Sequence, residues 1–254
     1  MRELLEAVAA GDLSPAEAEA QLRGYATTGA GRFDAGREKR RGVPEAILAA
    51  GKSPSEVATL TRAALKTTSH ALVTRVSEAD VAAVTGEVDD DVTVDHDERG
   101  RTLLARQPGY EPPTLDAAVT IVTGGTADGS VAAEAEAVLE VMGVDAVRVD
   151  DVGVAHLGRV LDHVEQLRAA DVLIVAAGRE GALPTVVAGL VDTPVIGVPV
   201  ASGYGHGGNG AAAVAGMLQS CTVLSVVNVG AGFVAGAQAG LIARAVDDAR
   251  GESE

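Results

Sequence analysis

Apolar and polar positions follow two different rhythms along this 254-residue chain. In the second half, continuous apolar runs alternate with segments whose apolar residues recur every three or four positions. A short continuous apolar run predicts a strand buried on both faces, and the longer period predicts a helix. Five strands are therefore expected, with helices between them and after the last: 117–125, 145–153, 171–178, 193–200 and 223–229.

Strands that alternate with helices predict a parallel sheet that is covered by helices on both faces. We expect this three-layer α/β domain to occupy residues 111–254. Sheets of this kind bind ligands at the carboxyl ends of their strands, so the loops that follow the strands form the candidate site.

The first half, residues 1–110, mixes charged and apolar positions and predicts a small α+β domain. Ser53 and Glu56 form a capping box at the start of a helix that runs to Leu65. The segment 27–42 is expected to be flexible, and the proline-rich "PGYEPP" marks the boundary between the domains. The remaining expected elements are two short helices within 1–23, a strand at 70–76, a capped helix at 77–84 and a hairpin at 89–107.

The charge of the chain restricts its partners. Twenty Lys and Arg face 36 Asp and Glu, which gives a net charge of −16. A surface this acidic repels phosphate backbones, so nucleic-acid binding is disfavoured. The composition is typical of a salt-rich, halophilic cytoplasm, where most carboxylates serve solvation. With a single cysteine, no signal peptide and no apolar run of membrane length, we expect a cytoplasmic protein that binds no membrane.

The loop after the first predicted strand, "TGGTADGS", places Gly124, Gly125 and Thr126 ahead of a helix, with Asp128 near its start. Free N–H groups at a helix N-terminus suit a phosphate. The alternative, that Asp128 only caps the helix, is equally consistent with the sequence. In the second loop, Asp150, Asp151 and His156 are more simply explained as surface residues.

Glu180 stands between glycines in "GREGALP", where small residues let the backbone turn tightly and approach a ligand. Pro184 follows at a position where a helix can begin. Two interpretations stay open: a carboxylate held over a substrate, and one more solvated surface charge.

The segment 201–221 holds five glycines between 203 and 210 and then a helix, which predicts a mobile lid or a phosphate cradle. Cys221 follows that helix, at the end whose dipole disfavours a thiolate. A lone cysteine there is usually a core residue, and it becomes a nucleophile only if the substrate brings a positive charge.

Taken together, "GGTAD", "DVGVAHLGRVL", "GREGALP", "SGYG" and "MLQSC" resemble the C-terminal domain of the LarB family. These proteins serve nickel-pincer cofactor biosynthesis, and their fold is related to the PurE aminoimidazole ribonucleotide (AIR) carboxylases. "FDAGREKRRGVPEAILAAGKSP" and "ALVTRV" resemble the family's N-terminal domain, so the likeness covers roughly the whole chain. The resemblance implies a flavodoxin-like, PurE-like catalytic domain and a homo-oligomer, an octamer as in PurE.

The resemblance also implies an activity. The family carboxylates the pyridinium ring of nicotinic acid adenine dinucleotide with CO2 or bicarbonate as co-substrate. It then hydrolyses the phosphoanhydride, giving pyridinium-3,5-biscarboxylic acid mononucleotide and AMP. Cys221 would add to the cationic ring as the nucleophile, and Glu180 would act as the acid/base group. The implied substrate-binding residues are Gly124, Gly125, Thr126, Asp128, Asp151, Gly181, Ala182, Ser202, Gly203, Tyr204, Gly205 and Asn228.

No tightly bound cofactor is expected; Mg2+ is considered, but no metal ligands are assigned. The chain departs from the family pattern at Ala127, where a serine is usual, and at His156 and Gly158, where glycine and histidine are usual. "GHGGNG" at 205–210 also differs, and "NVGAGF" at 228–233 lacks an acid and an amide. Two other functions stay open: a PurE-like AIR carboxylase or mutase, which needs no thiol, and a nucleotide-binding module without catalysis.

Overall fold

The computed structural model describes residues 2–11 and 15–251. The chain divides into two compact units, Met1–Glu111 and Pro112–Glu254. No helix among the described residues combines the length and the apolar composition needed to cross a bilayer.

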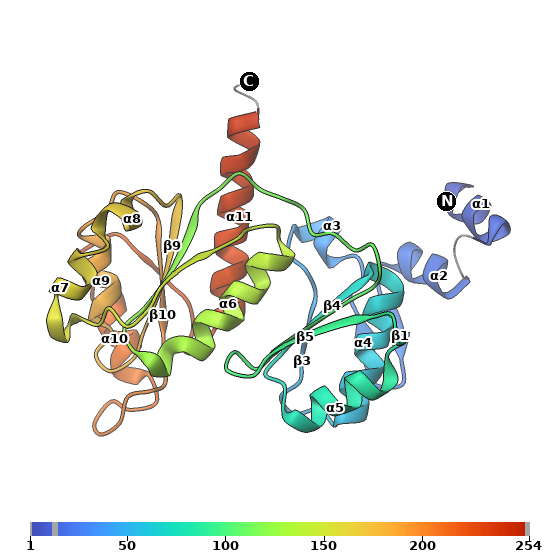
Figure 1. Cartoon of the computed structure of the whole chain (residues 1–254), viewed down its shortest axis with the longest axis horizontal. Coiled ribbons are helices and arrows are strands. Elements are labelled where there is room, and N and C mark those ends of the chain that lie inside the picture. Colours follow the sequence, from blue (N-terminus) through green and yellow to red (C-terminus); the bar gives the residue numbers. More distant parts are fainter. Residues whose placement is uncertain (1, 12–14, 252–254) are drawn as a thin grey trace. The chain divides into compact units, whose positions relative to one another are not determined.

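The first unit is built on a mixed four-stranded sheet of order β3-β4-β6-β5 (Figure 1). β3 (Ala46–Leu48) is parallel to β4 (His70–Thr74), whereas β6 (Thr102–Arg106) is antiparallel to β4 and to β5 (Thr93–Asp97). Alternate residues of β4 and β6 point to α4 (Pro54–Thr68) and α5 (Glu78–Glu87), with which they form one apolar core.

Both of these helices begin at capping boxes, as the sequence predicts. The Ser53 hydroxyl accepts a hydrogen bond from the Glu56 N–H, and the Glu56 carboxylate accepts one from the Ser53 N–H. Ser77 and Asp80 make the same exchange at α5. The paired helices α1 (Arg2–Ala10) and α2 (Pro15–Arg23), the strand β4 and the hairpin β5–β6 are also confirmed.

The expectation of a flexible segment at 27–42 is wrong. This stretch contains most of the hairpin β1 (Ala26–Thr28) and β2 (Gly31–Phe33), and α3 (Arg37–Arg41) follows. The hairpin turn is held by Thr28, whose hydroxyl donates to the Gly31 carbonyl and accepts from the Ala30 N–H. Ion pairs of Arg40 with Asp34 and of Arg37 with Glu45 hold the segment that follows the hairpin. The strand β3 was not predicted.

The second unit contains the predicted five-stranded parallel sheet, in the order β11-β10-β9-β7-β8. The first strand in the chain, β7, lies between the second, β8, and the third, β9, and the sheet then continues to β10 and β11. This is the flavodoxin-like strand order, and it confirms the expected fold class. Their bounds are β7 (Val119–Thr123), β8 (Val147–Val149), β9 (Val172–Ala177), β10 (Val195–Pro199) and β11 (Ser225–Val226).

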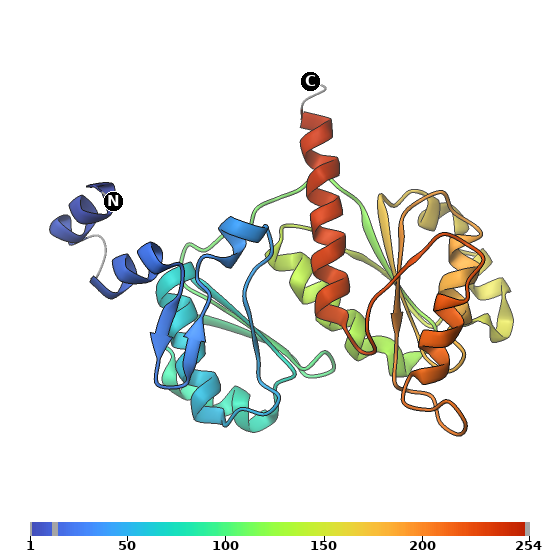
Figure 2. The same ribbon diagram turned by 180° about the vertical axis from the view of Figure 1, so that it is seen from behind.

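Helices cover both faces of this sheet (Figures 1 and 2). Ile121 and Ile174 point to the face packed by α6 (Gly129–Val141) and α11 (Gly232–Gly251). Val122 and Val175 belong to the core on the other side, under α9 (Ala182–Ala188) and α10 (Ala211–Leu218). That side also carries the short helices α7 (Gly158–Leu161) and α8 (Val164–Arg168).

α6 and α11 meet almost backbone to backbone. A Cβ atom at Gly236 would lie 2.5 Å from the carbonyl oxygen of Ala135, so only glycine allows this approach. Gly232 and Gly240 lie equally close, against the carbonyl of Val131 and the side chain of Met142.

The predicted boundaries shift at three places. The strand expected at 223–229 is reduced to the two residues of β11, and the helix expected between the second and third strands is split into α7 and α8. α9 begins at Ala182, two residues before Pro184, because Gly181 makes the turn that starts it. Short 3-10 turns, η1 (Thr126–Asp128) and η2 (Val154–His156), lie in the first two loops.

Candidate active site at the carboxyl edge of the sheet

A cleft of about 790 Å³ opens at the carboxyl ends of the central strands of the second unit. Its walls come from the loops after β7, β8 and β9, with Ser202 from the loop after β10 and Arg159 from α7. β7 and β9 are neighbours in the sheet although β8 lies between them in sequence. This is the point where the strand order reverses, and α/β sheets bind ligands there.

The cleft brings together eight of the predicted site residues: Gly124, Gly125, Thr126, Asp128, Asp151, Glu180, Ala182 and Ser202. The other six are not among its lining residues: Gly181, Gly203, Tyr204, Gly205, Cys221 and Asn228.

Asp128 is the buried acid of the cleft, with 4% of its surface exposed. Its carboxylate accepts a hydrogen bond of 2.9 Å from the Gly125 N–H and one of 3.3 Å from the Ser202 hydroxyl. Burial raises the pKa of the Asp128 carboxyl, and the hydrogen bonds from Gly125, Ser202 and Gly124 oppose this only in part. Asp128 therefore holds the glycine loop in shape and ties it to the loop after β10.

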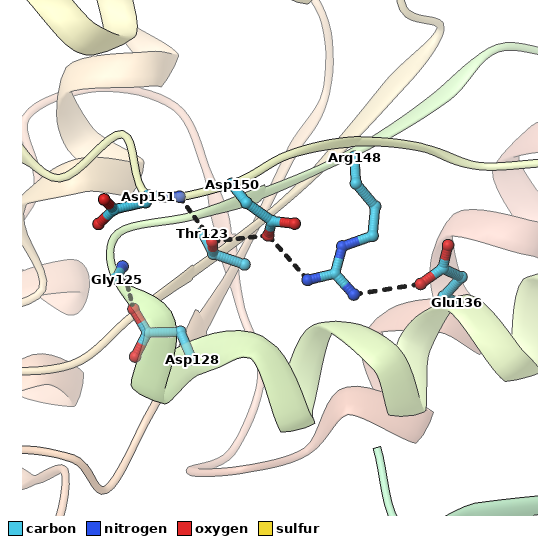
Figure 3. A network of polar contacts seen from close by, with 7 residues as sticks. All are labelled: Thr123, Gly125, Asp128, Glu136, Arg148, Asp150 and Asp151. Atoms are coloured by element: carbon cyan, nitrogen blue, oxygen red, sulfur yellow. Dashed lines mark hydrogen bonds and ion pairs between the residues drawn. The ribbon is translucent and has the colours of Figure 1, made fainter. Parts of the chain in front are cut away.

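A polar network fixes the neighbouring loop after β8 (Figure 3). The Thr123 hydroxyl donates to the Asp150 carboxylate over 2.8 Å and accepts from the Asp151 N–H over 3.1 Å. Arg148 bridges Asp150 and Glu136, at 2.7 and 3.1 Å. Asp150 is exposed, as predicted for a surface acid, and its carboxylate also connects β7 and β8 and, through Arg148, α6.

Arg159 braces the same loop from α7. Its guanidinium donates to the carbonyls of Asp151 and Gly153, at 2.8 and 3.2 Å, and lies 3.2 Å from the Asp151 carboxylate. Asp151 itself has a positive φ of 59°, an uncommon conformation for a residue with a side chain. His156, at the end of η2, is exposed and lies over Gly158, where a Cβ would come within 2.6 Å of the imidazole.

Glu180 is, like Asp151, an exposed acid of the cleft, and it sits in a strained turn. Arg179 before it has a φ of 53°, and Gly181 after it has a φ of 68°. The carbonyl of Ala213 would lie 2.5 Å from a Cβ at Gly181. Both the positive φ and this close contact therefore require glycine at this position. Backbone strain of this kind is concentrated at functional sites.

The loop after β10 lies against the Glu180 turn. A Cβ at Gly178 would collide with the Ser202 hydroxyl, and one at Gly203 would lie 3.5 Å from the backbone of Arg179. Beyond Gly203, Tyr204 is 79% exposed, and the Arg179 guanidinium lies over its ring, 4.5 Å from the centroid. Tyr204 thus contacts a residue of the cleft wall.

Cys221 is not among the residues that line the cleft, and its neighbour Thr222 contacts α9. It is exposed, and the hydroxyl of its neighbour Thr222 donates to the Thr185 carbonyl over 3.5 Å. Leu218 and Val223 on either side are 65% and 95% exposed. A single chain therefore does not bring Cys221 and Glu180 into one cleft, and it does not bury Cys221 in its core.

Asn228 lies in the connection from β11 to α11, where it is exposed. Its side-chain oxygen accepts a hydrogen bond from the Val229 N–H over 2.8 Å. Among the described residues, no three His, Cys, Asp or Glu side chains converge on a point that could hold a metal ion.

Two arginines of the cleft wall, Arg159 and Arg179, were not predicted as site residues. The sequence did offer a signal for them. Arginine supplies most of the few cations of this acidic chain, and Arg179 directly follows the predicted strand 171–178.

Comparisons with known proteins match both units. The LarB/PurE-like N-terminal domain model matches residues 25–107, and the AIR carboxylase model matches residues 118–250. The uncharacterized protein MJ0165 of Methanocaldococcus jannaschii is 37% identical over 256 residues, which cover 96% of this chain and 97% of that protein.

Two solved structures from Treponema denticola also match, PurE and a variant of PurE2, each with a TM-score of 0.38. PurE is 20% identical, and the match covers 54% of this chain and 96% of the PurE chain. The PurE2 variant is 19% identical, and the match covers 56% of this chain and 98% of the variant.

The two family models span both compact units, and the archaeal relative extends over nearly the entire chain. The chain therefore belongs to the LarB family of PurE-like proteins, which are related to the AIR carboxylases.

Proposed function

We propose that this protein carboxylates the pyridinium ring of nicotinic acid adenine dinucleotide and then hydrolyses the phosphoanhydride. The observation that carries the proposal is the exposed carboxylate of Glu180, held by a strained turn in a cleft that is lined by further acids and two arginines. Carboxylates suit a cationic ring, and the guanidinium groups suit the phosphates of a dinucleotide.

A pyridinium carbon is electron-poor and does not attack CO2. Addition of a thiolate to the ring makes a neutral enamine, whose nucleophilic carbon forms the new bond to CO2. Glu180 then takes the proton from that carbon, and the thiolate leaves as the ring regains its positive charge. Attack of water on the phosphoanhydride releases AMP and pyridinium-3,5-biscarboxylic acid mononucleotide.

The thiol in this scheme comes from Cys221. Because Cys221 lies outside the cleft of its own chain, we propose that a second copy supplies it in a homo-oligomer. The exposed side chains of Leu218 and Val223 beside it favour this arrangement, since association of copies would remove their apolar surface from water.

The test incubates the protein with nicotinic acid adenine dinucleotide and bicarbonate, with and without Mg2+, and measures AMP and the carboxylated mononucleotide. Wild type should form both, and Cys221→Ala should form no carboxylated product while still binding the dinucleotide. A mixture of Cys221→Ala and Glu180→Gln subunits should regain part of the activity, because some mixed sites then hold both groups. No AMP from folded wild-type protein would overturn the proposal.

The position of Cys221 also favours a second candidate, an AIR carboxylase or mutase. Its aminoimidazole substrate is already an enamine and needs no thiol. On that function, Cys221→Ala keeps full activity with aminoimidazole ribonucleotide, and wild type leaves nicotinic acid adenine dinucleotide unchanged.

A further inference from the structure

Tyr204 is placed unusually for an aromatic side chain. The chain has no tryptophan, three tyrosines and two phenylalanines, and Tyr204, which contacts Arg179 of the cleft wall, is 79% exposed. A large apolar surface left in water is informative when it lies beside a binding cleft.

One face of this ring already carries a cation. The Arg179 guanidinium lies 4.5 Å from the ring centroid, within the range of a cation–π contact. Arg179 makes no ion pair among the residues that the structure describes, although Glu180 follows it directly in the sequence. The guanidinium is therefore held by the ring and not by a carboxylate.

The backbone keeps the ring next to the cleft. Gly203 packs against the backbone of Arg179, and Ser202, one residue earlier, donates to Asp128 inside the cleft. Tyr204 therefore follows directly after two residues that fix the loop to the cleft wall.

Resting on the proposed function, we infer that Tyr204 is the platform that selects the cationic pyridinium ring, and that Arg179 occupies this platform until the ring arrives. The incoming ring displaces the guanidinium from the tyrosine face. Arg179 is then free to pair with a carboxylate or phosphate of the same ligand, where its planar fork makes two hydrogen bonds. The ring charge thus becomes a determinant of affinity.

The experiment measures the affinity of the full chain for three ligands: nicotinic acid adenine dinucleotide, its 1,4-dihydropyridine form, and AMP. The first two share the phosphates and the adenine and differ in ring charge. Wild type should bind the cationic form about five- to thirty-fold more tightly than the dihydro form, the range of a cation–π contact. Tyr204→Phe should keep this preference, Tyr204→Leu should lose it, and AMP should bind all three proteins equally.

A matched control is available in the first unit, where Arg32 lies 5.1 Å from the ring centroid of Tyr25. Tyr25→Leu removes a similar pair far from any cleft residue in sequence, and it should leave the preference unchanged. Tyrosine fluorescence provides a second readout, because a stacked pyridinium quenches Tyr204 in wild type and finds no such fluorophore in Tyr204→Phe.

Equal affinity of wild type for the two ring forms, or an intact preference in Tyr204→Leu, would overturn the inference. If the preference is found but no AMP forms during turnover, the proposed function fails and the role of Tyr204 stands. If AMP and carboxylated product form without any preference, the inference fails alone. Folded wild type that binds none of the three ligands contradicts both.

Discussion

Asp128 and Glu180 reach one cleft from the adjacent strands β7 and β9, yet their surroundings differ. Asp128 is buried and occupied with hydrogen bonds from Gly125 and Ser202, whereas Glu180 is exposed between two residues of positive φ. A carboxylate whose oxygens are used by its own loop is a positioning group. Among the described residues Glu180 accepts no hydrogen bond from its own loop, and together with the strained turn this favours its proposed role toward a bound molecule.

The sharpest test of this comparison is Glu180→Gln. On the proposed mechanism the variant loses proton transfer, so carboxylation should slow by about 10²- to 10⁴-fold. The free energy of unfolding should change by less than about 0.5 kcal/mol, since the side chain is exposed. Steady-state rates and urea unfolding measure the two quantities.

Glu165→Gln serves as the control, because Glu165 is an exposed carboxylate of α8 with 88% of its side chain accessible. It should have wild-type rates. Equal rates for Glu180→Gln and wild type would remove Glu180 from the chemistry and leave the two acids without the functional difference argued above.

The second prediction compares the glycines of the two turns. Gly181→Ala should destabilise the fold by about 2–4 kcal/mol, because its φ is 68° and its Cβ would lie 2.5 Å from the Ala213 carbonyl. Gly125→Ala should change stability by less than about 1 kcal/mol, since the backbone there is extended and the space around it is open. Urea unfolding of both variants checks the difference, and similar losses would show that the Glu180 turn is not the strained one.

The smallest effect is expected from Asp128→Asn, whose amide can still accept from Gly125 and donate to Ser202. Burial raises the pKa of the Asp128 carboxyl in the folded state, so the folded chain binds its proton more tightly than the unfolded chain. This contribution to stability is present below the unfolded pKa of about 3.9 and is lost as the pH rises through the raised value.

Unfolding free energies of wild type and Asp128→Asn are therefore compared over a pH series. The variant should gain stability relative to wild type across that window and keep a constant difference above it. The other carboxylates titrate in both proteins and cancel in the difference. If the unfolding free energies of the two proteins change in parallel with pH, the Asp128 carboxyl is not desolvated, and its surroundings resemble those of the exposed Glu180.

Local patterns made much of the fold predictable from the sequence. Ser53–Glu56 and Ser77–Asp80 begin helices through contacts between residues three apart. The short apolar runs of β7, β9 and β10 favour strands that are buried on both faces. The β1–β2 hairpin was missed because its strands have three residues each and depend on the turn at Thr28.

The candidate site was predictable only in outline. The rule for carboxyl ends of strands located Asp128 and Glu180 in one cleft, but the role of Asp150 depends on Arg148 and Glu136, which no spacing connects. The likeness to the family linked Cys221 with Glu180, although one chain keeps them apart. On the proposal that a second copy supplies Cys221, the link between these two residues is a contact between copies, which the pattern of a single sequence does not reveal.

The glycine contacts between α6 and α11 hold these two helices at a fixed position along each other. Gly232, Gly236 and Gly240 stand four residues apart on α11, and a Cβ at any of them would lie within 2.5 Å of an atom of α6 or of Met142 just after it. The Asp128 turn leads directly into α6, so close backbone contact between α6 and α11 helps to set its position relative to α11. Substitutions on the exposed faces of α6 and α11 should therefore leave the position of Asp128, just before α6, unchanged.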